Sequence, residues 1–310
     1  MTEHAFQTRA KGKLLITGEY AVLDGALALA LPVRYGQTLR VEPADTAGVL
    51  HWEALNADGA TWFNGEFGRP SFEIIRSNDS GTAERLRQIL LVIRQLNPDF
   101  LAGEQAGLRI VTQIDFPRQW GLGTSSTLIA AIARWAGVDP YALLAATFGG
   151  SGYDIACAYA EAPVLFHLKN GSPVVETAHF SPAFSAQLYF VFLGKKQDSR
   201  EGIRRYRKKK EGSTSLVAEV SALTRRAFQA GSLAEFEQVL AAHEVLMQKI
   251  LDLPRARELY FPDYWGEVKS LGAWGGDFVL VTSARSEAET RDFFNEKGFG
   301  VFMRWKDMIL

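Results

Sequence analysis

The hydrophobic and polar positions along the chain change their spacing several times, and each spacing predicts a different element. Residues 38–43, TLRVEP, alternate apolar and polar side chains as a strand does. Two such runs at residues 49–67 flank Asn56–Gly59, a turn composition that predicts a hairpin. At residues 84–97, ERLRQILLVIRQLN, the apolar side chains recur at helical spacing, and strand alternation returns at residues 107–117.

The second half of the chain continues this mixture and then becomes mainly helical. Gly137 ends a predicted helix at residues 128–136, and Asp139 and Pro140 have the character of a cap and first turn of the next helix. The other predicted elements are strands at residues 162–168, 187–194, 277–283 and 300–305 and helices at residues 200–210, 215–231, 232–251 and 286–297.

Strand and helix signals are therefore intermixed along the chain. The proline-containing stretch SPAF and the change to helical texture after it favour two domains, at residues 1–183 and 184–310. We find no internal repeat and no low-complexity linker that would favour another division.

Composition narrows the classes of partner. The 310 residues include 34 basic and 35 acidic side chains, so the charge does not favour nucleic acid or an acidic membrane surface. The single cysteine, Cys157, excludes an internal disulfide and fits a reducing compartment. Without a signal-peptide pattern or a long apolar run, we expect a soluble cytoplasmic protein with a small-molecule or protein partner. The sequence does not determine the oligomeric state, and a homodimer remains open.

The stretch GLGTSST at residues 121–127 places glycines and four hydroxyl side chains directly before a predicted helix. Glycines allow backbone N–H groups to approach an anion, and the helix start adds unsatisfied donors and the positive end of the helix dipole. This arrangement favours a phosphate-binding loop. The alternative is an ordinary helix start with Thr124 or Ser125 as its cap.

Two further segments give this loop a context. KGKLLITGEYAVLDG at residues 11–25 and KSLGAWGGDFVLV at residues 269–281 are glycine-containing turns joined to strands. In order and spacing, the three segments together resemble the three motifs of the GHMP kinase superfamily, and GSGYDIA around Gly152 is similar to one branch of it. The resemblance implies an α+β fold, the two-domain GHMP kinase fold, with a half like domain 2 of ribosomal protein S5 followed by a ferredoxin-like α/β sandwich.

The resemblance also implies a set of site residues. ATP would be bound by Gly121, Leu122, Gly123, Thr124, Ser125 and Ser126, with Ser125 contacting Mg²⁺. Lys13 matches a lysine near the transferred phosphoryl group, and Asp154 matches the aspartate thought to act as general base in mevalonate kinases. The local alternatives are a solvated lysine at a strand end and an Asx-type turn after Ser151 and Gly152.

Several local features are similar to phosphomevalonate kinases, which act on an anionic substrate. They include GEY in the first segment and Asp277 at the end of GAWGGD. Basic residues such as Lys195, Lys196 and Arg200 suit a substrate that bears carboxylate and phosphate, although a solvated basic helix face is the alternative. The residues expected to contact substrate are Glu19, Tyr20, Lys195, Ser199, Arg200, Gly272 and Trp274; for Glu19 the alternative is a solvated turn residue.

The chain also departs from the family pattern. Mevalonate kinases carry a glutamate shortly before the GSG-type motif, but residues 140–153 contain no acid. Trp274 stands where the third motif has glycine, so it either narrows the acceptor pocket or marks a displaced loop. An alcohol acceptor would need Asp154 as a base, whereas a phosphate acceptor would scarcely need one. Mevalonate kinase and a catalytically inactive ligand-binding or interaction protein therefore remain alternatives to phosphomevalonate kinase.

Overall fold

The computed structural model describes residues 5–103, 106–195, 199–209, 214–272, 274 and 277–310. Backbone contacts divide the chain into two compact units. The first unit comprises Met1–Gly12, Tyr35–Arg118 and Gly123–Tyr159, and the second comprises Lys13–Arg34, Gln119–Leu122 and Ala160–Leu310. The domain boundary expected between residues 183 and 184 lies within the second unit and stays a prediction.

The first unit is a sheet covered by helices. In it the strands follow the order β5-β4-β3-β6-β2, with β3 parallel to β6 and the other neighbours antiparallel. Its elements, including β1 and β2 that run on into the second unit, are β1 (Phe6–Thr17), β2 (Ala28–Ala44), β3 (Val49–Leu55), β4 (Thr61–Gly68), β5 (Ile74–Ser77), α1 (Ser80–Leu96), β6 (Gly107–Ile114), α2 (Thr124–Ala136), α3 (Pro140–Thr147) and α4 (Tyr153–Tyr159), with a short helix η2 (Arg118–Trp120) before α2.

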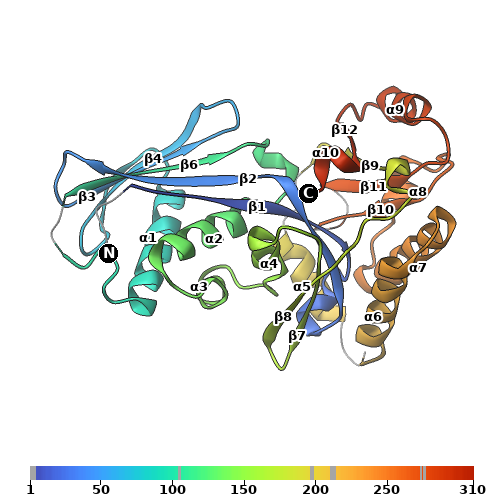
Figure 1. Ribbon diagram of the computed structural model, residues 1–310, viewed down its shortest axis with the longest axis horizontal. Helices are drawn as coiled ribbons and strands as arrows, with labels where there is room; N and C mark the ends of the chain where they lie inside the picture. The colour runs from blue at the N-terminus through green and yellow to red at the C-terminus, as the bar shows by residue number, and fades with distance from the viewer. Residues whose placement is uncertain (1–4, 104–105, 196–198, 210–213, 273, 275–276) are drawn as a thin grey trace. The chain divides into compact units, whose positions relative to one another are not determined.

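The core of the first unit lies between this sheet and the helices α1 to α4, which lie along one face of it (Figure 1). Leu39 and Ile110 from the sheet and Ile89 and Ile129 from the helices are fully buried in it. Their positions follow the strand and helix spacing seen in the sequence. The predicted hairpin is also confirmed, since the Asn56 N–H donates to the carbonyl of Ala60 at 2.9 Å.

The local start and stop signals act as the sequence predicts. Asp139 caps α3 by accepting a hydrogen bond from the Tyr141 N–H at 2.9 Å, with Pro140 at the first helical position. Gly137 ends α2 with a positive φ of 65°, a backbone conformation that glycine adopts at little cost.

The second unit contains its own sheet, with strand order β10-β11-β9-β12 and antiparallel pairing throughout. A separate pairing joins the start of β2 to β7 and β7 to β8. The further elements are η1 (Ala21–Asp24), β7 (Val164–Lys169), β8 (Ser172–Thr177), η3 (Ser185–Gln187), β9 (Leu188–Phe192), α5 (Ser199–Lys209), α6 (Thr214–Gln229), α7 (Leu233–Leu251), α8 (Ala256–Tyr260), β10 (Val268–Ser270), β11 (Phe278–Thr282), α9 (Glu287–Glu296), β12 (Phe302–Arg304) and α10 (Trp305–Met308).

Two apolar clusters stabilise the second unit. One packs Val191 and Val279 of the sheet against Phe294 of α9 and Phe261 after α8. The other gathers side chains of η1, α5, α6 and α7 around Trp274. Because both clusters are assembled from distant parts of the chain, they hold the glycine-containing turns of this unit in one arrangement.

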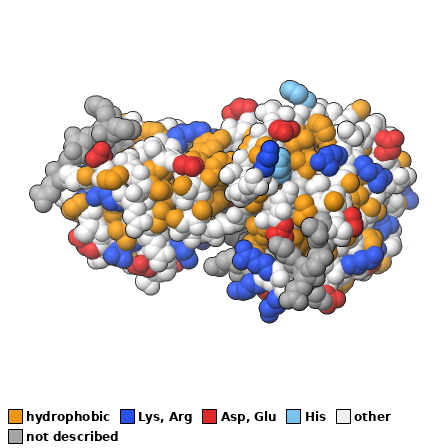
Figure 2. Space-filling view, turned by 90° about the horizontal axis from the view of Figure 1, so that it is seen from below, with side chains coloured by type: hydrophobic (Ala, Val, Ile, Leu, Met, Phe, Trp, Pro, Cys, Tyr) orange, Lys and Arg blue, Asp and Glu red, His pale blue; other side chains and the backbone are white. Residues whose placement is uncertain are grey.

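The surface agrees with the near-neutral composition. On the face shown in Figure 2, acidic and basic side chains are interspersed with apolar ones over most of the surface, and the formal net charge is −1. None of the helices in the described part of the chain is long and apolar enough to cross a membrane. Cys157 is buried and makes no disulfide.

Candidate active site

In the second unit, Lys13 is held against the loop at Gly121 and Leu122. Strand β1 places Lys13 so that its backbone N–H donates to the Leu122 carbonyl at 3.0 Å. Its Nζ donates to the Gly121 carbonyl, also at 3.0 Å. Two residues 108 positions apart in sequence are thus joined by backbone and side chain. The ammonium is positioned at the loop, and its place near a transferred phosphoryl group stays a prediction.

Gly121 and Gly272 both lie against the carboxyl group of Asp277. Gly121 has a φ of +68°, and a Cβ atom there would come within 2.5 Å of Asp277 Cγ. A Cβ atom on Gly272 would come within 2.8 Å of Asp277 Oδ2. Glycine is therefore required at both positions by close approach as well as by backbone conformation. Asp277, expected only from its place in the motif, packs against both turns.

In the first unit, helix α2 begins at a residue that has no capping side chain. Gly123 is the N-cap, with a φ of 97° and no side-chain hydrogen bond to the first turn. Thr124 and Ser125 lie inside that turn, so the alternative that one of them is the cap is wrong. Ser125 is exposed and Thr124 half-buried. A helix start with uncapped N–H groups and exposed hydroxyls suits a phosphate group.

The next two hydroxyls of the stretch are already engaged within the first unit. Ser126 is buried, and its Oγ donates to the Gly123 carbonyl at 2.9 Å. Thr127 Oγ1 donates to Gln37 Oε1 at 2.7 Å. These contacts fix the start of α2 on the sheet, and they leave Thr124 and Ser125 as the hydroxyls better placed to meet a ligand.

Asp154 lies in the first turn of α4, also in the first unit. It is half-buried, and its Oδ1 accepts a hydrogen bond from the Ile155 N–H at 3.0 Å. Gly152 just before the helix has a φ of +91°, and a Cβ atom there would come within 2.9 Å of the Tyr141 ring. The turn before Asp154 is thus tightly specified, while the role of Asp154 as a base stays a prediction.

Glu19 is buried at the centre of a polar cluster in the second unit. Its side chain is 1% exposed and forms an ion pair with Lys269 Nζ. Its Oε2 lies 3.2 Å from Nε2 of His243, which accepts a hydrogen bond from the Gly18 N–H at 3.1 Å. Burial raises the pKa of Glu19 to about 7, although Lys269 opposes the shift. The alternative of a solvated turn residue is wrong.

Glu244 completes this cluster from helix α7. It accepts hydrogen bonds from Ser270 Oγ at 3.0 Å and from the Trp274 indole at 3.1 Å, and it lies 3.3 Å from Lys269 Nζ. Trp274 is 2% exposed and has a φ of 56°. The large ring is therefore accommodated inside the second unit. Its predicted contact with substrate stays a prediction.

We name the set Glu19, His243, Glu244, Lys269, Ser270 and Trp274 the Lys269 cluster. Sequence reasoning singled out Glu19 and Trp274 from their motifs. It missed Lys269 and Glu244, because no local pattern indicates that a lysine in a short strand pairs with a carboxylate 250 positions away.

Tyr20 connects the turn after Glu19 to helix α5. Its ring stacks on Tyr206 with a centroid distance of 6.0 Å, and Tyr206 Oη donates to Asp24 Oδ2 at 2.6 Å. A Cβ atom on Gly202 would come within 2.1 Å of Tyr20 Oη, so α5 lies directly on this hydroxyl. Burial raises the pKa of the Tyr20 phenol, with the charge of Glu19 contributing, so the phenol stays neutral near physiological pH.

The remaining predicted site residues are less informative. Lys195 is exposed. Lys196, Gly275, Gly276 and the side chains of Ser199 and Arg200 lie outside the described residues. Within the described ranges, no three His, Cys, Asp or Glu side chains are grouped so that they could hold a metal ion.

Comparisons with known proteins identify this architecture. No family model matches the chain, and no curated protein matches it by sequence. Among solved structures, L. major mevalonate kinase in complex with R-mevalonate is 18% identical, with a TM-score of 0.66 over 96% of this chain and 94% of that one. Streptococcus pneumoniae phosphomevalonate kinase in complex with phosphomevalonate and AMPPNP is 14% identical, with a TM-score of 0.70 over 96% and 99%.

Lactococcus lactis galactokinase complexed with galactose is also similar, at 11% identity and a TM-score of 0.69 over 98% of this chain and 93% of that one. These neighbours act on different acceptors, so the likeness identifies the fold and leaves the substrate open. The fold expected from the three motifs is confirmed: this chain has the two-domain α+β fold of the GHMP kinases.

Proposed function

We propose that this protein is an ATP-dependent kinase that phosphorylates a small anionic molecule of isoprenoid-precursor metabolism, with 5-phosphomevalonate as the leading acceptor. The observation that carries the proposal is the uncapped start of α2 after Gly123, which offers N–H groups and the positive end of a helix dipole to a phosphate group. The GHMP kinase fold supports the same activity.

Each of these residues has a separate role in the proposed phosphoryl transfer. The N–H groups at the start of α2 and the hydroxyls of Thr124 and Ser125 would hold phosphate oxygens, with Ser125 also meeting Mg²⁺. Lys13 would neutralise charge on the phosphoryl oxygens. ATP supplies the phosphoryl group, and ADP leaves as the bond to the acceptor oxygen forms. If the acceptor is a hydroxyl, Asp154 would take its proton.

Mevalonate is the second candidate acceptor, and Asp154 is the observation that favours it. A phosphate acceptor is largely ionised near neutral pH and needs little help from a base, whereas a hydroxyl needs one. Asp154 sits in a turn specified by Gly152, which a merely solvated aspartate would not require.

A coupled assay of ADP release with MgATP tests the proposal. The purified chain would be assayed in parallel with mevalonate, 5-phosphomevalonate, homoserine and galactose. We expect turnover with 5-phosphomevalonate. Turnover only with mevalonate would establish the second candidate, and turnover only with galactose or homoserine would overturn the proposed acceptor class. Nucleotide binding without turnover on any acceptor would favour an inactive binding protein.

Two variants separate chemistry from binding. Asp154→Asn should lower kcat by orders of magnitude on a hydroxyl acceptor and leave MgATP binding nearly unchanged, whereas a phosphate acceptor should tolerate it. Ser125→Ala should weaken MgATP binding. Thr147→Ala, in α3 of the same unit, is a control: this hydroxyl donates to the helix carbonyls of Leu143 and Leu144, and its loss should leave MgATP binding unchanged.

A further inference from the structure

The hydrogen bonds of the His243 ring depend on whether Glu19 is protonated. The Gly18 N–H donates to His243 Nε2 at 3.1 Å, so that nitrogen presents its lone pair and the ring proton is on Nδ1. Glu19 Oε2 lies 3.2 Å from the same Nε2. An ionised oxygen facing a nitrogen lone pair would be repelled, and neither this oxygen nor His243 Nδ1 has any other hydrogen-bond partner among the described residues. The geometry is therefore that of a protonated Glu19, whose O–H shares the single lone pair of Nε2 with the Gly18 N–H.

The charges around Glu19 lead to the same protonation state. Lys269 from β10 is the cation that faces it, and Glu244 from α7 competes for the same ammonium group. One positive charge balances one carboxylate, so burial favours a proton on the other carboxyl group. The pKa of His243 is held well below its usual value by burial and by Lys269, which keeps the ring neutral. Tyr20, the next residue, is also neutral.

We propose that Glu19 and His243 form a proton-coupled pair that positions the turn at Gly18–Tyr20. When Glu19 releases its proton to solvent, the ring proton of His243 moves from Nδ1 to Nε2 and is donated to the new carboxylate. The ring stays neutral, and Nε2 no longer accepts the Gly18 N–H. The amide then loses its partner, so the turn that carries Glu19 and Tyr20 is held less firmly. His243 is a positioning residue in this scheme.

The consequence for catalysis rests on the proposed kinase function, because Glu19 and Tyr20 belong to the expected acceptor site. The proton coupling itself does not depend on any activity. Loss of one hydrogen bond that positions the turn should raise the acceptor KM by about three- to tenfold as pH passes through neutrality, with less effect on kcat.

NMR of the full chain with ¹⁵N-labelled histidine tests the coupling directly. The chain has five histidines, and His243→Gln identifies the signals of His243 by their loss. From pH 5.5 to 8.5 we expect the wild-type ring to change from the Nδ1–H to the Nε2–H tautomer without passing through imidazolium. In Glu19→Gln the side-chain amide donates to Nε2 as the protonated acid does, so the Nδ1–H tautomer should persist throughout.

Glu267→Gln is the matched control, because Glu267 is another partly buried carboxyl group of the second unit whose pKa is raised by burial. It should show the wild-type tautomer change. A wild-type ring that keeps one tautomer over the whole range, or that becomes imidazolium, overturns the proposal. So does a Glu19→Gln variant whose tautomer still changes with pH.

The pH profile of the acceptor KM separates this inference from the proposed function. A tautomer change without turnover on any acceptor would refute the kinase and leave the coupling standing. A working kinase whose KM does not change with pH, despite the tautomer change, would overturn the positioning role. We expect a KM that rises with pH in the wild type and a flat profile in Glu19→Gln.

Discussion

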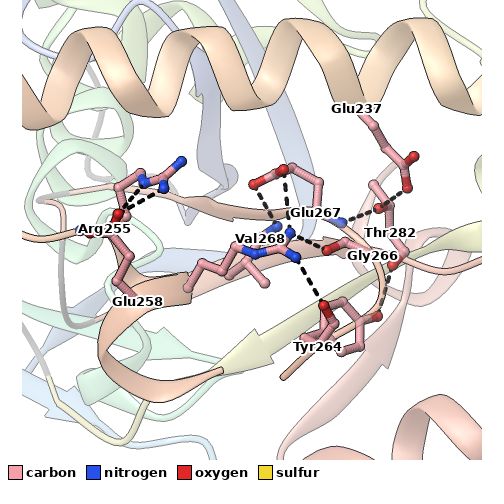
Figure 3. Close-up of polar contacts among 9 residues, drawn as sticks. Glu237, Arg255, Glu258, Tyr264, Gly266, Glu267, Val268 and Thr282 are labelled. Carbon is pink, nitrogen blue, oxygen red and sulfur yellow. Dashed lines mark hydrogen bonds and ion pairs between the residues drawn. The ribbon is translucent and has the colours of Figure 1, made fainter. Parts of the chain in front are cut away.

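Two polar networks of the second unit meet at strand β10, and they use their cations differently. In the Lys269 cluster, a fully buried ammonium lies between the carboxyl groups of Glu19 and Glu244. In the other network, shown in Figure 3, Arg257 donates to the backbone carbonyls of Gly266 and Tyr264 and lies 3.5 Å from Glu267. We call this second set, with Thr282 and Glu237, the Arg257 network.

The two networks differ in how deeply their side chains are buried and in how far apart in sequence the joined segments are. Arg257 and Glu267 have side chains that are 29% and 12% exposed, whereas those of Lys269 and Glu244 are fully buried. The Arg257 network mainly closes a local connection between α8 and β10, while the Lys269 cluster joins segments from both ends of the chain. A guanidinium that donates to carbonyls stabilises a turn, whereas an ammonium shared by two carboxyl groups makes the structure sensitive to protons.

The largest expected effect comes from removing each cation. Lys269→Met leaves two buried carboxyl groups without their counter-charge and should lower the free energy of unfolding by about 3–5 kcal/mol at pH 8. Arg257→Met loses hydrogen bonds to carbonyls in a partly exposed site and should cost about 1–2 kcal/mol. Urea unfolding of both variants measures the difference.

The decrease in the free energy of unfolding caused by Lys269→Met should be smaller at pH 5.5, because the two carboxyl groups can then be protonated. The decrease caused by Arg257→Met should depend little on pH. Equal losses in the two variants, or a Lys269→Met loss that is the same at both pH values, would contradict the difference drawn between the networks.

The second prediction concerns the pH dependence of stability. Glu19 has its pKa raised from 4.5 to about 7, so the folded chain keeps a proton that the unfolded chain releases between these values. Its stabilising contribution is complete below pH 4.5 and is lost as pH rises through 7. The pKa of His243 is lowered from its usual value of 6.5. Its contribution to the free energy of unfolding therefore rises with pH, up to about pH 6.5.

The difference in the free energy of unfolding between the wild type and Glu19→Gln isolates the contribution of the Glu19 carboxyl group, since His243 is present in both. The stability of the wild type relative to the variant should fall by roughly 3 kcal/mol between pH 4.5 and 8. Glu267→Gln should show the same sign and a smaller change, because Glu267 is less buried. Urea unfolding across this pH range provides the measurement, and parallel curves for wild type and Glu19→Gln would refute the assignment.

The contrast between the networks also explains what could be predicted from the sequence. Long periodic segments such as α7 and the apolar run of β11 were predicted, because their patterns reflect burial on one face or on both. Strand β10 was missed. It has three residues and a lysine at its centre, and only partners distant in sequence, Glu19 and Glu244, make a buried lysine there stable.

The candidate site could also be predicted only in part from the sequence. The motifs indicated a glycine turn at Gly121, because a requirement for glycine is a local property, and the structure brings Lys13 to Gly121 and Leu122. They did not indicate that Glu19 is buried, since the residues GEY have the composition of a solvated turn. Burial of a charged side chain depends on tertiary partners, which no local pattern encodes.

The third prediction compares two hydrogen-bond donors, one from each network. Trp274→Phe removes the indole N–H from Glu244 and some ring volume, and it should cost roughly 2–3 kcal/mol. Tyr264→Phe removes only the hydroxyl that donates to the Thr282 carbonyl at 2.8 Å, and it should cost about 1 kcal/mol. Thermal or urea unfolding ranks the two variants. A larger loss for Tyr264→Phe would show that the carboxylate acceptor adds nothing.

The smallest expected effect lies at the exposed edge of the region in Figure 3, where Arg255 Nη2 lies 2.7 Å from Glu258 Oε1. Both groups are solvent-accessible, so water and salt screen their attraction. Glu258→Gln keeps an acceptor for the Arg255 N–H and should lower the free energy of unfolding by about 0.5 kcal/mol in low salt, and by less in 1 M salt. If the variant lost as much as Lys269→Met, ion pairing in this unit would not depend on burial. A small, salt-sensitive loss would instead place this exposed pair and the Lys269 cluster at opposite ends of one scale set by access to solvent.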